Sequence, residues 1–167
     1  MKHRIVRMTE RHVTSYHAAF DRVARERKYF SMLKAPPLRD MRKFVRGIIH
    51  AKDLQFVALA GDSVVGWCDI VRARHETMRH CGVLAIAVVP EYRGVGIGLG
   101  LMKRAIAAAW RRRFTRLELV VREDNRAAIA LYRRLGFKAE GVRRNVTLVD
   151  GKYFNMLAMA LLKDGKS

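Results

Sequence analysis

The chain has 167 residues, half of them hydrophobic, and carries 34 Lys and Arg against 15 Asp and Glu, for a formal net charge of +19. This length predicts a single domain over residues 1–167 with its own core. Cys68 and Cys81 form no CxxC pair, which argues against a disulfide framework and against a zinc site. Since the sequence shows neither a membrane-length apolar run nor a signal-peptide core, we expect a cytoplasmic protein with no membrane partner.

The positive charge is suited to polyanions, which include nucleic acid, anionic membranes and phosphorylated cofactors. The arginines are dispersed, however, with short clusters only at residues 111–113, 133–134 and 143–144. Aromatic residues do not alternate with these clusters, as they would on a surface that binds single strands. A generally basic surface is therefore favoured, and nucleic acid is disfavoured as a partner.

The first part of the chain predicts a strand and two helices. The strand lies near residues 4–8, and Thr9 is the expected N-cap of the first helix. The apolar residues at helical spacing in that helix are Val13, Tyr16, Phe20 and Val23. Pro36 and Pro37 interrupt the helical pattern. The second helix then carries Leu38, Met41, Val45 and Ile48 on one face.

Three strands and a third helix are expected next. Residues 55–73 read as two strands joined at Gly61-Asp62. Residues 83–89 form a near-continuous apolar strand, which predicts burial on both faces. The third helix runs from about residue 96 to residue 113, and its predicted inner stripe is Leu99, Met102, Ile106 and Ala109.

The C-terminal part predicts a fifth strand at residues 116–121 and a fourth helix with Asn125 as N-cap and Gly136 as C-cap. The inner face of that helix should carry Ala128, Leu131, Tyr132 and Leu135. Two more strands, at about residues 137–143 and 154–161, are separated by a segment that turns at Asp150-Gly151. This order of elements indicates an α/β protein with a mixed sheet and helices on both of its faces.

Four glycines follow the fourth strand at every second position, from Gly94 to Gly100. Their GxGxGxG spacing fits neither the GxGxxG dinucleotide motif nor the NTPase phosphate loop. Glycines at a helix N-terminus let backbone N–H groups approach an anion closely, and Arg93 could add a fork of donors. A diphosphate is the predicted ligand, although the glycines could also serve only to permit a tight turn.

The segment "PEYRGVGIG", with Arg93, Gly96 and Gly98 in an RxxGxG pattern, is followed after a strand by "DNRAAIALYRRLGF". Together these motifs resemble the acetyl-CoA site of the GNAT superfamily of N-acetyltransferases. The resemblance implies a single α/β (α+β) domain, with a mixed, mainly antiparallel twisted sheet of about seven strands and about four helices. The closing "AEG" at residues 139–141, the "DG" turn and the apolar last strand resemble the bacterial branch that acetylates small amines and amino acids.

The resemblance also implies the ligand and its site. Acetyl-CoA would be the co-substrate, and no metal would be needed. The pyrophosphate would be held by backbone N–H groups of Arg93, Gly94, Val95, Gly96, Ile97 and Gly98. The pantetheine arm would pair with Ile86, Ala87 and Val88 as an added strand. Asn125 would contact the arm or the loop beside it, or act only as an N-cap. Tyr132 would lie near the sulfur, or be an ordinary core aromatic.

The chemistry expected at such a site is direct transfer in a ternary complex, because no nucleophile paired with a base is visible. An amine must lose a proton before it attacks the thioester. Tyr132 could protonate the departing thiolate, and a strand N–H near Val88 could hold the carbonyl oxygen. The base could be Asp69, Glu118 or a water molecule.

The acceptor is less well defined. Residues 28–37 and 143–154, including Tyr29 and Phe30, are the expected walls of its site. Relatives that acetylate ribosomal protein N-termini carry a glutamate five residues before the equivalent of Asn125, where this chain has Val120. A small-molecule amine, such as an amino acid or a xenobiotic amine, is therefore favoured. A protein N-terminal or ribosomal-protein acetyltransferase stays open, as does a basic CoA-binding or nucleic-acid-associated regulator without catalysis. A homodimer is compatible with a sheet protein of this kind.

Overall fold

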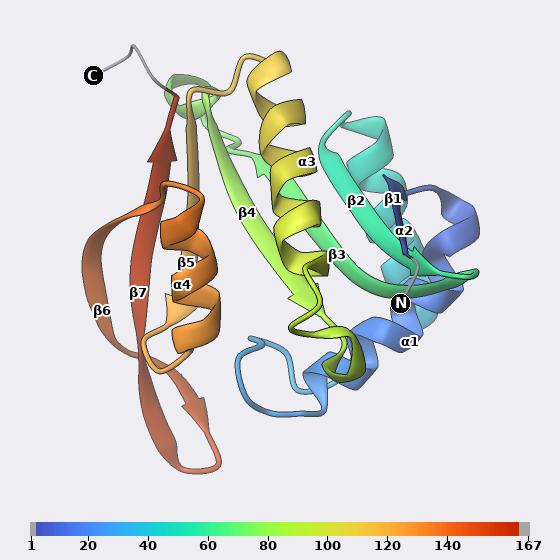
Figure 1. Cartoon of the computed structure of the whole chain (residues 1–167), viewed down its shortest axis with the longest axis horizontal. Coiled ribbons are helices and arrows are strands. Elements are labelled where there is room, and N and C mark those ends of the chain that lie inside the picture. The colour runs from blue at the N-terminus through green and yellow to red at the C-terminus, as the bar shows by residue number, and fades with distance from the viewer. Residues whose placement is uncertain (1–2, 164–167) are drawn as a thin grey trace.

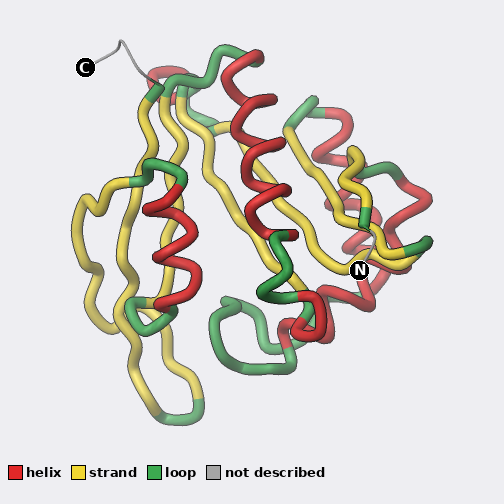
Figure 2. The backbone as a smooth tube through the Cα atoms, viewed as in Figure 1, coloured by secondary structure: helices red, strands yellow, loops and turns green. Residues whose placement is uncertain are grey.

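The computed structural model describes residues 3–163, which form one seven-stranded sheet with four helices (Figures 1 and 2). The helices are α1 (Val13–Ala24), α2 (Leu38–His50), α3 (Ile97–Arg111) and α4 (Arg126–Arg134). The strands are β1 (Arg4–Arg7), β2 (Leu54–Ala60), β3 (Ser63–Arg72), β4 (Cys81–Val88), β5 (Arg116–Arg122), β6 (Lys138–Val149) and β7 (Lys152–Leu162). The predicted element order and the mixed, mainly antiparallel sheet are confirmed.

The strand order across the sheet is β1-β2-β3-β4-β5-β7-β6, and only the β4–β5 pair is parallel. Helices α3 and α4 lie on one face of this sheet, and α1 and α2 lie on the other (Figure 1). None of the helices within residues 3–163 has the length and apolarity needed to cross a membrane.

The helix ends agree with the local signals that predicted them. Thr9 caps a short 3-10 turn (Glu10–His12) that leads directly into α1, and Asn125 caps α4. Gly136 ends α4 with a left-handed φ of 92°. These caps depend on residues close in sequence, which is why the sequence could locate them.

The inner face of α3 differs in part from the predicted stripe. Met102, Ile106 and Ala109 are buried as expected, but Leu99 is only half-buried. Leu101 and Ala105 are fully buried instead, so the contact line of the helix runs through residues 97, 101, 105 and 108. Apolar residues cover most of α3, with charges only at Lys103, Arg104 and Arg111. Several apolar stripes therefore satisfied helical spacing, which left this rotation open.

An aromatic cluster fixes α1 against β3. Trp67 is buried, and its ring centroid lies 5.2 Å from that of Tyr16 and 5.6 Å from that of Phe20. Phe30, in the link between α1 and α2, closes the cluster at 6.0 Å from Trp67. Edge-to-face and offset contacts of this kind each add about 0.5–1.5 kcal/mol beyond area burial. The α1–α2 link is therefore anchored at one of its own residues.

Strands β4 and β5 are paired only at their first residues. Cys81–Val83 pair with Arg116–Glu118, and beyond this point the two strands have no partner residues in common. Each strand keeps its other neighbour, since β4 pairs with β3 and β5 pairs with β7. The sheet therefore contains a wedge that opens from Val83 towards the C-terminal ends of β4 and β5.

The prediction that the fourth strand is buried on both faces was wrong. Val83 is 48% exposed, and Ala85 is also exposed. Both residues lie on the face covered by α1 and α2, and those helices pack on β2 and β3 rather than on β4. The apolar run is therefore a strand with one open face beside the wedge.

The last two strands are longer than predicted. Asp150 and Gly151 are the two turn residues of a direct β6–β7 hairpin, with φ values of 48° and 75°. Two positive φ angles match the turn type in which Asp-Gly is preferred. The extension of β6 was missed because most of this edge strand is exposed, so its side chains do not alternate between apolar and polar residues.

Candidate functional site

The glycine turn before α3 presents a row of free backbone donors. Gly94 and Gly96 have left-handed φ values of 77° and 87°, and an added Cβ at either position would meet nothing within 4 Å. The first helical hydrogen bond joins the Gly100 N–H to the Gly96 carbonyl. Within the described chain the N–H groups of residues 94–99 have no backbone acceptor, because the first turn of a helix leaves its donors unpaired. These groups, with the positive end of α3, suit an anion.

Arg93 does not aim its side chain at that anion position. Its guanidinium donates to the Val88 carbonyl at 2.8 Å and to both carboxylate oxygens of Glu26 at 2.8 and 2.5 Å. The Arg93 N–H is also used, since it donates to the Pro90 carbonyl at 3.2 Å. The expected fork of donors is therefore bound within the protein, and Arg93 fixes the shape of the turn.

A second ion pair joins the same two segments, between Arg22 of α1 and Glu91. Arg22 lies in the last turn of α1, and Glu26 follows two residues after the end of that helix. Their partners, Glu91 and Arg93, precede the glycines by only a few residues. The C-terminal end of α1 thus holds the turn at two points.

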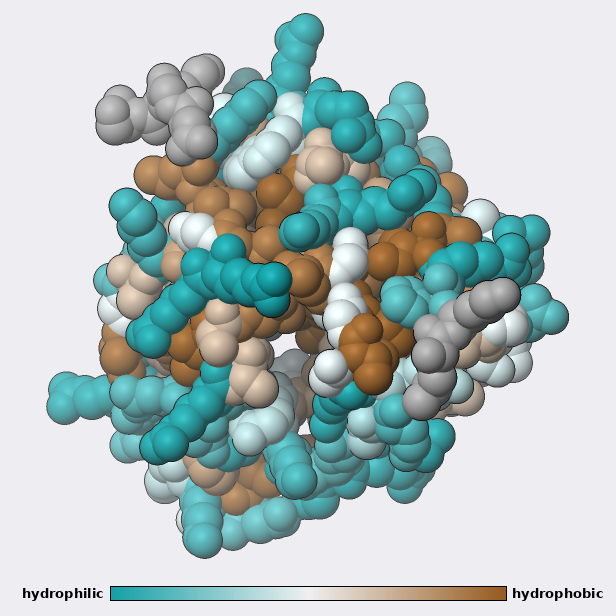
Figure 3. All heavy atoms as spheres, in the orientation of Figure 1, coloured by the Kyte–Doolittle hydropathy of each residue, from teal (hydrophilic) through white to brown (hydrophobic). Residues whose placement is uncertain are grey.

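The open edge of β4 offers backbone groups to the wedge. The Val89 N–H donates to the Val65 carbonyl of β3 at 3.0 Å. Because hydrogen-bonded groups alternate along an antiparallel strand, Ala87 also bonds towards β3, whereas Ile86 and Val88 point their groups into the wedge. The Val88 carbonyl is occupied by Arg93. The Val88 N–H and both backbone groups of Ile86 therefore face the wedge, and Figure 3 shows the surface hollowed between α3 and α4.

Tyr132 lies on α4, close enough to Cys68, the β3 partner of Ile86, for that thiol to affect its pKa, and Asn125 precedes the helix. Tyr132 is 7% exposed, and its ring centroid lies 5.9 Å from that of Phe137. Burial raises the pKa of Tyr132, and the Cys68 thiol adds to the rise, so the phenol is protonated at neutral pH. The Asn125 side-chain oxygen accepts from the Ala128 N–H at 3.2 Å, which confirms the N-cap. A contact from Asn125 to a ligand stays a prediction.

Asp69 lies in the core on the other face of the sheet. It pairs across the sheet with Gln55 of β2 and with Ala85 of β4. Within the described residues Asp69 Oδ1 has no hydrogen-bond partner. Burial raises the pKa of Asp69 to about 7, and the neighbouring amide of Gln55 offsets only part of the rise. The carboxyl can therefore change its protonation state near neutral pH.

Glu118 is placed differently. Its carboxylate accepts from Arg116 at 3.1 Å, and Arg116 also pairs with Glu140. Glu118 lies opposite Val83, at the closed end of the wedge. The three predicted catalytic residues are therefore not brought into one cluster, because Tyr132 approaches from the α4 side while Asp69 and Glu118 lie on the opposite face.

Arg122 is a buried charge that the sequence reasoning missed. It pairs with Asp124, donates to the Lys28 carbonyl, and lies 3.4 Å from the ring centroid of Phe154. A signal was available, since an arginine ends an apolar strand and an aspartate follows two residues later. Arg122 thus ties the α1–α2 link to β5 and β7.

The two segments predicted as acceptor walls do lie together. Besides the Arg122 contacts, Arg27 at the end of α1 forms an ion pair with Asp150 in the β6–β7 turn. Beside them the open face of the wedge carries Val83 and Val120, each 48% exposed. The function of these segments as acceptor walls stays a prediction. Among the described residues no group of three His, Cys, Asp or Glu side chains could hold a metal ion.

Comparisons with known proteins agree with this geometry. The Acetyltransferase (GNAT) family pattern matches residues 16–137. The N-alpha-acetyltransferase RimI of Mycobacterium tuberculosis is 38% identical over 94 residues, which cover 56% of this chain and 58% of that protein. The L-amino acid N-acetyltransferase AaaT of Escherichia coli is 32% identical over 111 residues, which cover 65% of this chain and 68% of that protein. The matched part of this chain thus spans less than two thirds of the length of the Mycobacterium tuberculosis protein.

A solved structure has the same fold. A putative acetyltransferase from Salmonella typhimurium, described with its cofactor acetyl-CoA, superposes with a TM-score of 0.91 at 17% identity, over 99% of this chain and 96% of that one. This likeness concerns the fold, because the identity is low. The family pattern covers most of the chain and includes the glycine turn, the wedge and the helix that carries Tyr132. The chain therefore belongs to the acetyltransferase (GNAT) family.

Proposed function

We propose that this protein transfers the acetyl group of acetyl-CoA to a primary amine. The observation that carries the proposal is the wedge between β4 and β5, with the free N–H groups of residues 94–99 at one end and Tyr132 beside it. The free donors fit a pyrophosphate, and the unpaired edge at Ile86 and Val88 fits the amide groups of the pantetheine arm. Acetyl-CoA would supply the reactive thioester.

The residues of the chain have separate functions in this proposal. The Val88 N–H holds the carbonyl oxygen as it becomes negative. As the new C–N bond forms and the C–S bond breaks, the Tyr132 phenol gives its proton to the departing sulfur. The proton that leaves the amine nitrogen passes through water to Asp69, which is buried one strand away from the wedge. After the products leave, the Tyr132 phenolate takes up a proton from water and Asp69 releases one, so that both groups return to their starting states. Glu118 is less suited to this step, since Arg116 holds it at the closed end.

A small amine is the acceptor that the surroundings of the wedge favour. The ion pair of Arg27 with Asp150 and the contacts of Arg122 draw the α1–α2 link and the β6–β7 hairpin together. Both segments thus border the open face that holds Val120, which precedes Arg122 by two residues on β5. A protein N-terminus is the second candidate, and the likeness to an N-alpha-acetyltransferase supports it.

The test is a thiol-release assay with acetyl-CoA and two acceptor panels, one of amino acids and small amines, the other of short peptides with free N-termini. We expect faster release with the first panel. Tyr132→Phe should lower kcat by about 10²-fold or more, while the Kd for CoA in calorimetry changes little. Tyr92→Phe, which removes a phenol near the turn, is the matched control. An unchanged kcat in Tyr132→Phe would exclude the phenol as proton donor.

A further inference from the structure

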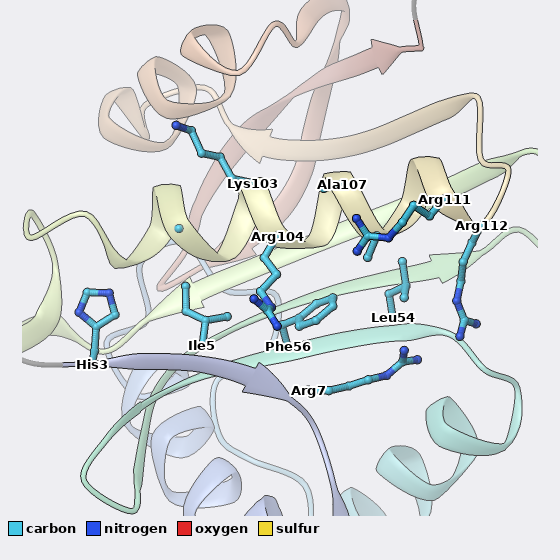
Figure 4. A pocket seen from close by; sticks show the side chains of 12 residues that line it. His3, Ile5, Arg7, Leu54, Phe56, Lys103, Arg104, Ala107, Arg111 and Arg112 are labelled. Carbon is cyan, nitrogen blue, oxygen red and sulfur yellow. The ribbon is translucent and has the colours of Figure 1, made fainter.

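A basic groove lies on the side of α3 that faces β1 and β2, away from α4 (Figures 1 and 4). Its volume is about 820 Å³. Its charged or titratable lining residues are Lys103, Arg104, Arg111, Arg112, Arg7 and His3. No acidic residue is among the 12 residues that line it. The fold therefore brings together basic residues that are separated along the sequence.

The charges of this groove are not neutralised by the protein. Within residues 3–163 none of its lysines or arginines takes part in an ion pair. Arg7 donates to the Asp53 carbonyl at 3.0 Å, and Arg112 donates to the adjacent Lys52 carbonyl. Burial lowers the pKa of Arg7, and the charge of Arg112 lowers it further. Two like charges are thus held side by side, an arrangement that an anion would relieve.

The lining also limits the chemistry of the ligand. Apart from His3, its polar side chains are lysines and arginines, which donate hydrogen bonds and accept none. A peptide would bring N–H donors that these side chains could not satisfy. A phosphodiester chain brings acceptors and negative charge without such donors. The lining therefore favours a phosphate backbone over an acidic peptide.

The shape of the groove fits an extended strand. Arg104 and Arg111 are seven residues apart on α3, which is about 10 Å at about 1.5 Å per residue, so the two guanidinium groups can reach neighbouring phosphates of one strand. Phe56 lies buried under Arg104, 5.9 Å from its guanidinium carbon. Since this ring is covered, it cannot stack on a base. A hollow site is also poorly suited to the flat surface of a membrane.

We propose that the basic groove binds the phosphate backbone of a single-stranded nucleic acid, without sequence preference and at a site separate from the wedge. The expectation from the sequence disfavoured nucleic acid because the arginines are dispersed along the chain and because aromatic residues do not alternate with them. The fold brings residues 7, 104 and 111–112 to one surface, which removes the first objection. The second objection concerns base stacking, and the proposed contacts are made to phosphates alone.

The test is fluorescence anisotropy with a labelled oligouridylate of about a dozen nucleotides, at salt concentrations from about 50 to 200 mM. The variant Arg104→Ala/Arg111→Ala removes two exposed charges of the groove that form no ion pair in the described chain. Arg133→Ala/Arg134→Ala on α4 is the matched control with the same change in net charge. We expect the groove variant to bind about tenfold more weakly or worse, with the slope of log Kd against log salt reduced by about 1.4, or about 0.7 per phosphate contact.

Three outcomes would overturn the proposal. Equal losses in the two variants would mean that net charge alone attracts the RNA. Displacement of the oligonucleotide by saturating CoA would place it at the glycine turn. Tight binding of polyglutamate of equal charge, with none of the oligouridylate, would assign the groove to an acidic polypeptide. Circular dichroism of both variants separates a loss of binding from a loss of folding.

Discussion

Asp69→Asn should make the protein more stable at neutral and alkaline pH, although it removes a charged group from the core. The carboxyl of Asp69 is buried between Gln55 and Ala85, and its Oδ1 has no partner in the described structure. A buried carboxylate without compensation is costly, so the folded state favours the protonated acid. Asparagine has nearly the same shape and carries no charge at any pH.

The size of the effect follows from the change in pKa. The folded state raises the pKa of Asp69 from 3.8 to about 7, which corresponds to about 4 kcal/mol. Because the folded pKa is the higher one, the unfolded state loses its proton first as the pH rises. The parent therefore loses stability from about pH 4 to about pH 7 and little more above that. The free energy of unfolding of Asp69→Asn should rise by about 3 to 4 kcal/mol relative to the parent between pH 4 and pH 8.

Urea unfolding at pH 4, 6 and 8 measures the free energy of unfolding of the variant minus that of the parent. The other acids contribute equally to both proteins, so their contributions cancel in this difference. Asp62→Asn is the matched control, since its side chain is fully exposed, and its difference from the parent should be nearly constant with pH. A difference for Asp69→Asn that stays flat from pH 4 to pH 8 would show that Asp69 is solvated or paired in the folded protein. The reasoning on its ionisation, and its proposed function as the base, would then fail together.

Three further changes test how the wedge is built. Gly96→Ala should lower the free energy of unfolding by about 1 kcal/mol, because the φ of this residue is 87° although an added Cβ meets no atom within 4 Å. The same variant should bind CoA more weakly in calorimetry. The control is Gly47→Ala in α2, where an added Cβ also meets no atom within 4 Å; it should raise the free energy of unfolding by about 1 kcal/mol in the same urea titration. Glu26→Gln should weaken CoA binding about threefold to fivefold, because it frees Arg93 and loosens the turn; tighter binding would mean that Arg93 contacts the ligand. Arg122→Ala should lower the free energy of unfolding by about 2 to 3 kcal/mol in urea titrations, because it removes the hydrogen bonds that Arg122 donates to Asp124 and to the Lys28 carbonyl and its packing on Phe154. A loss below about 0.5 kcal/mol, as at ordinary surface sites, would contradict this reasoning.

Features set by residues close in sequence could be predicted. The Asn125 cap, the Gly136 helix end and the turn at Gly61 each depend on a short segment, and the structure has all three. The glycine turn was predicted for the same reason. The half-buried Leu99 and the long β6 were missed because their environment depends on which neighbours pack against them, and periodicity carries no information about that.

Features set by distant residues could not be predicted. Arg93 was expected to meet a phosphate because it stands beside the glycines, but its carboxylate partner, Glu26, is 67 positions away, just after the end of α1. The open face of β4 was missed likewise, because an apolar segment does not reveal that α1 and α2 stop at β3. In both cases the local chemistry was read correctly, and the tertiary neighbour determined its use.

The two proposed anion sites share α3 without sharing a surface. At its N-terminus α3 presents the unpaired N–H groups of residues 97–99, where the helix dipole is positive. Along its side it presents Arg104 and Arg111 to the groove (Figure 4). Arg111 lies in the last turn, where the negative end of the dipole stabilises a cation even when no ligand is bound. Since the N-terminal donors belong to the backbone, the side-chain charges of the groove can be removed without altering the wedge, and this independence lets the two sites be tested separately.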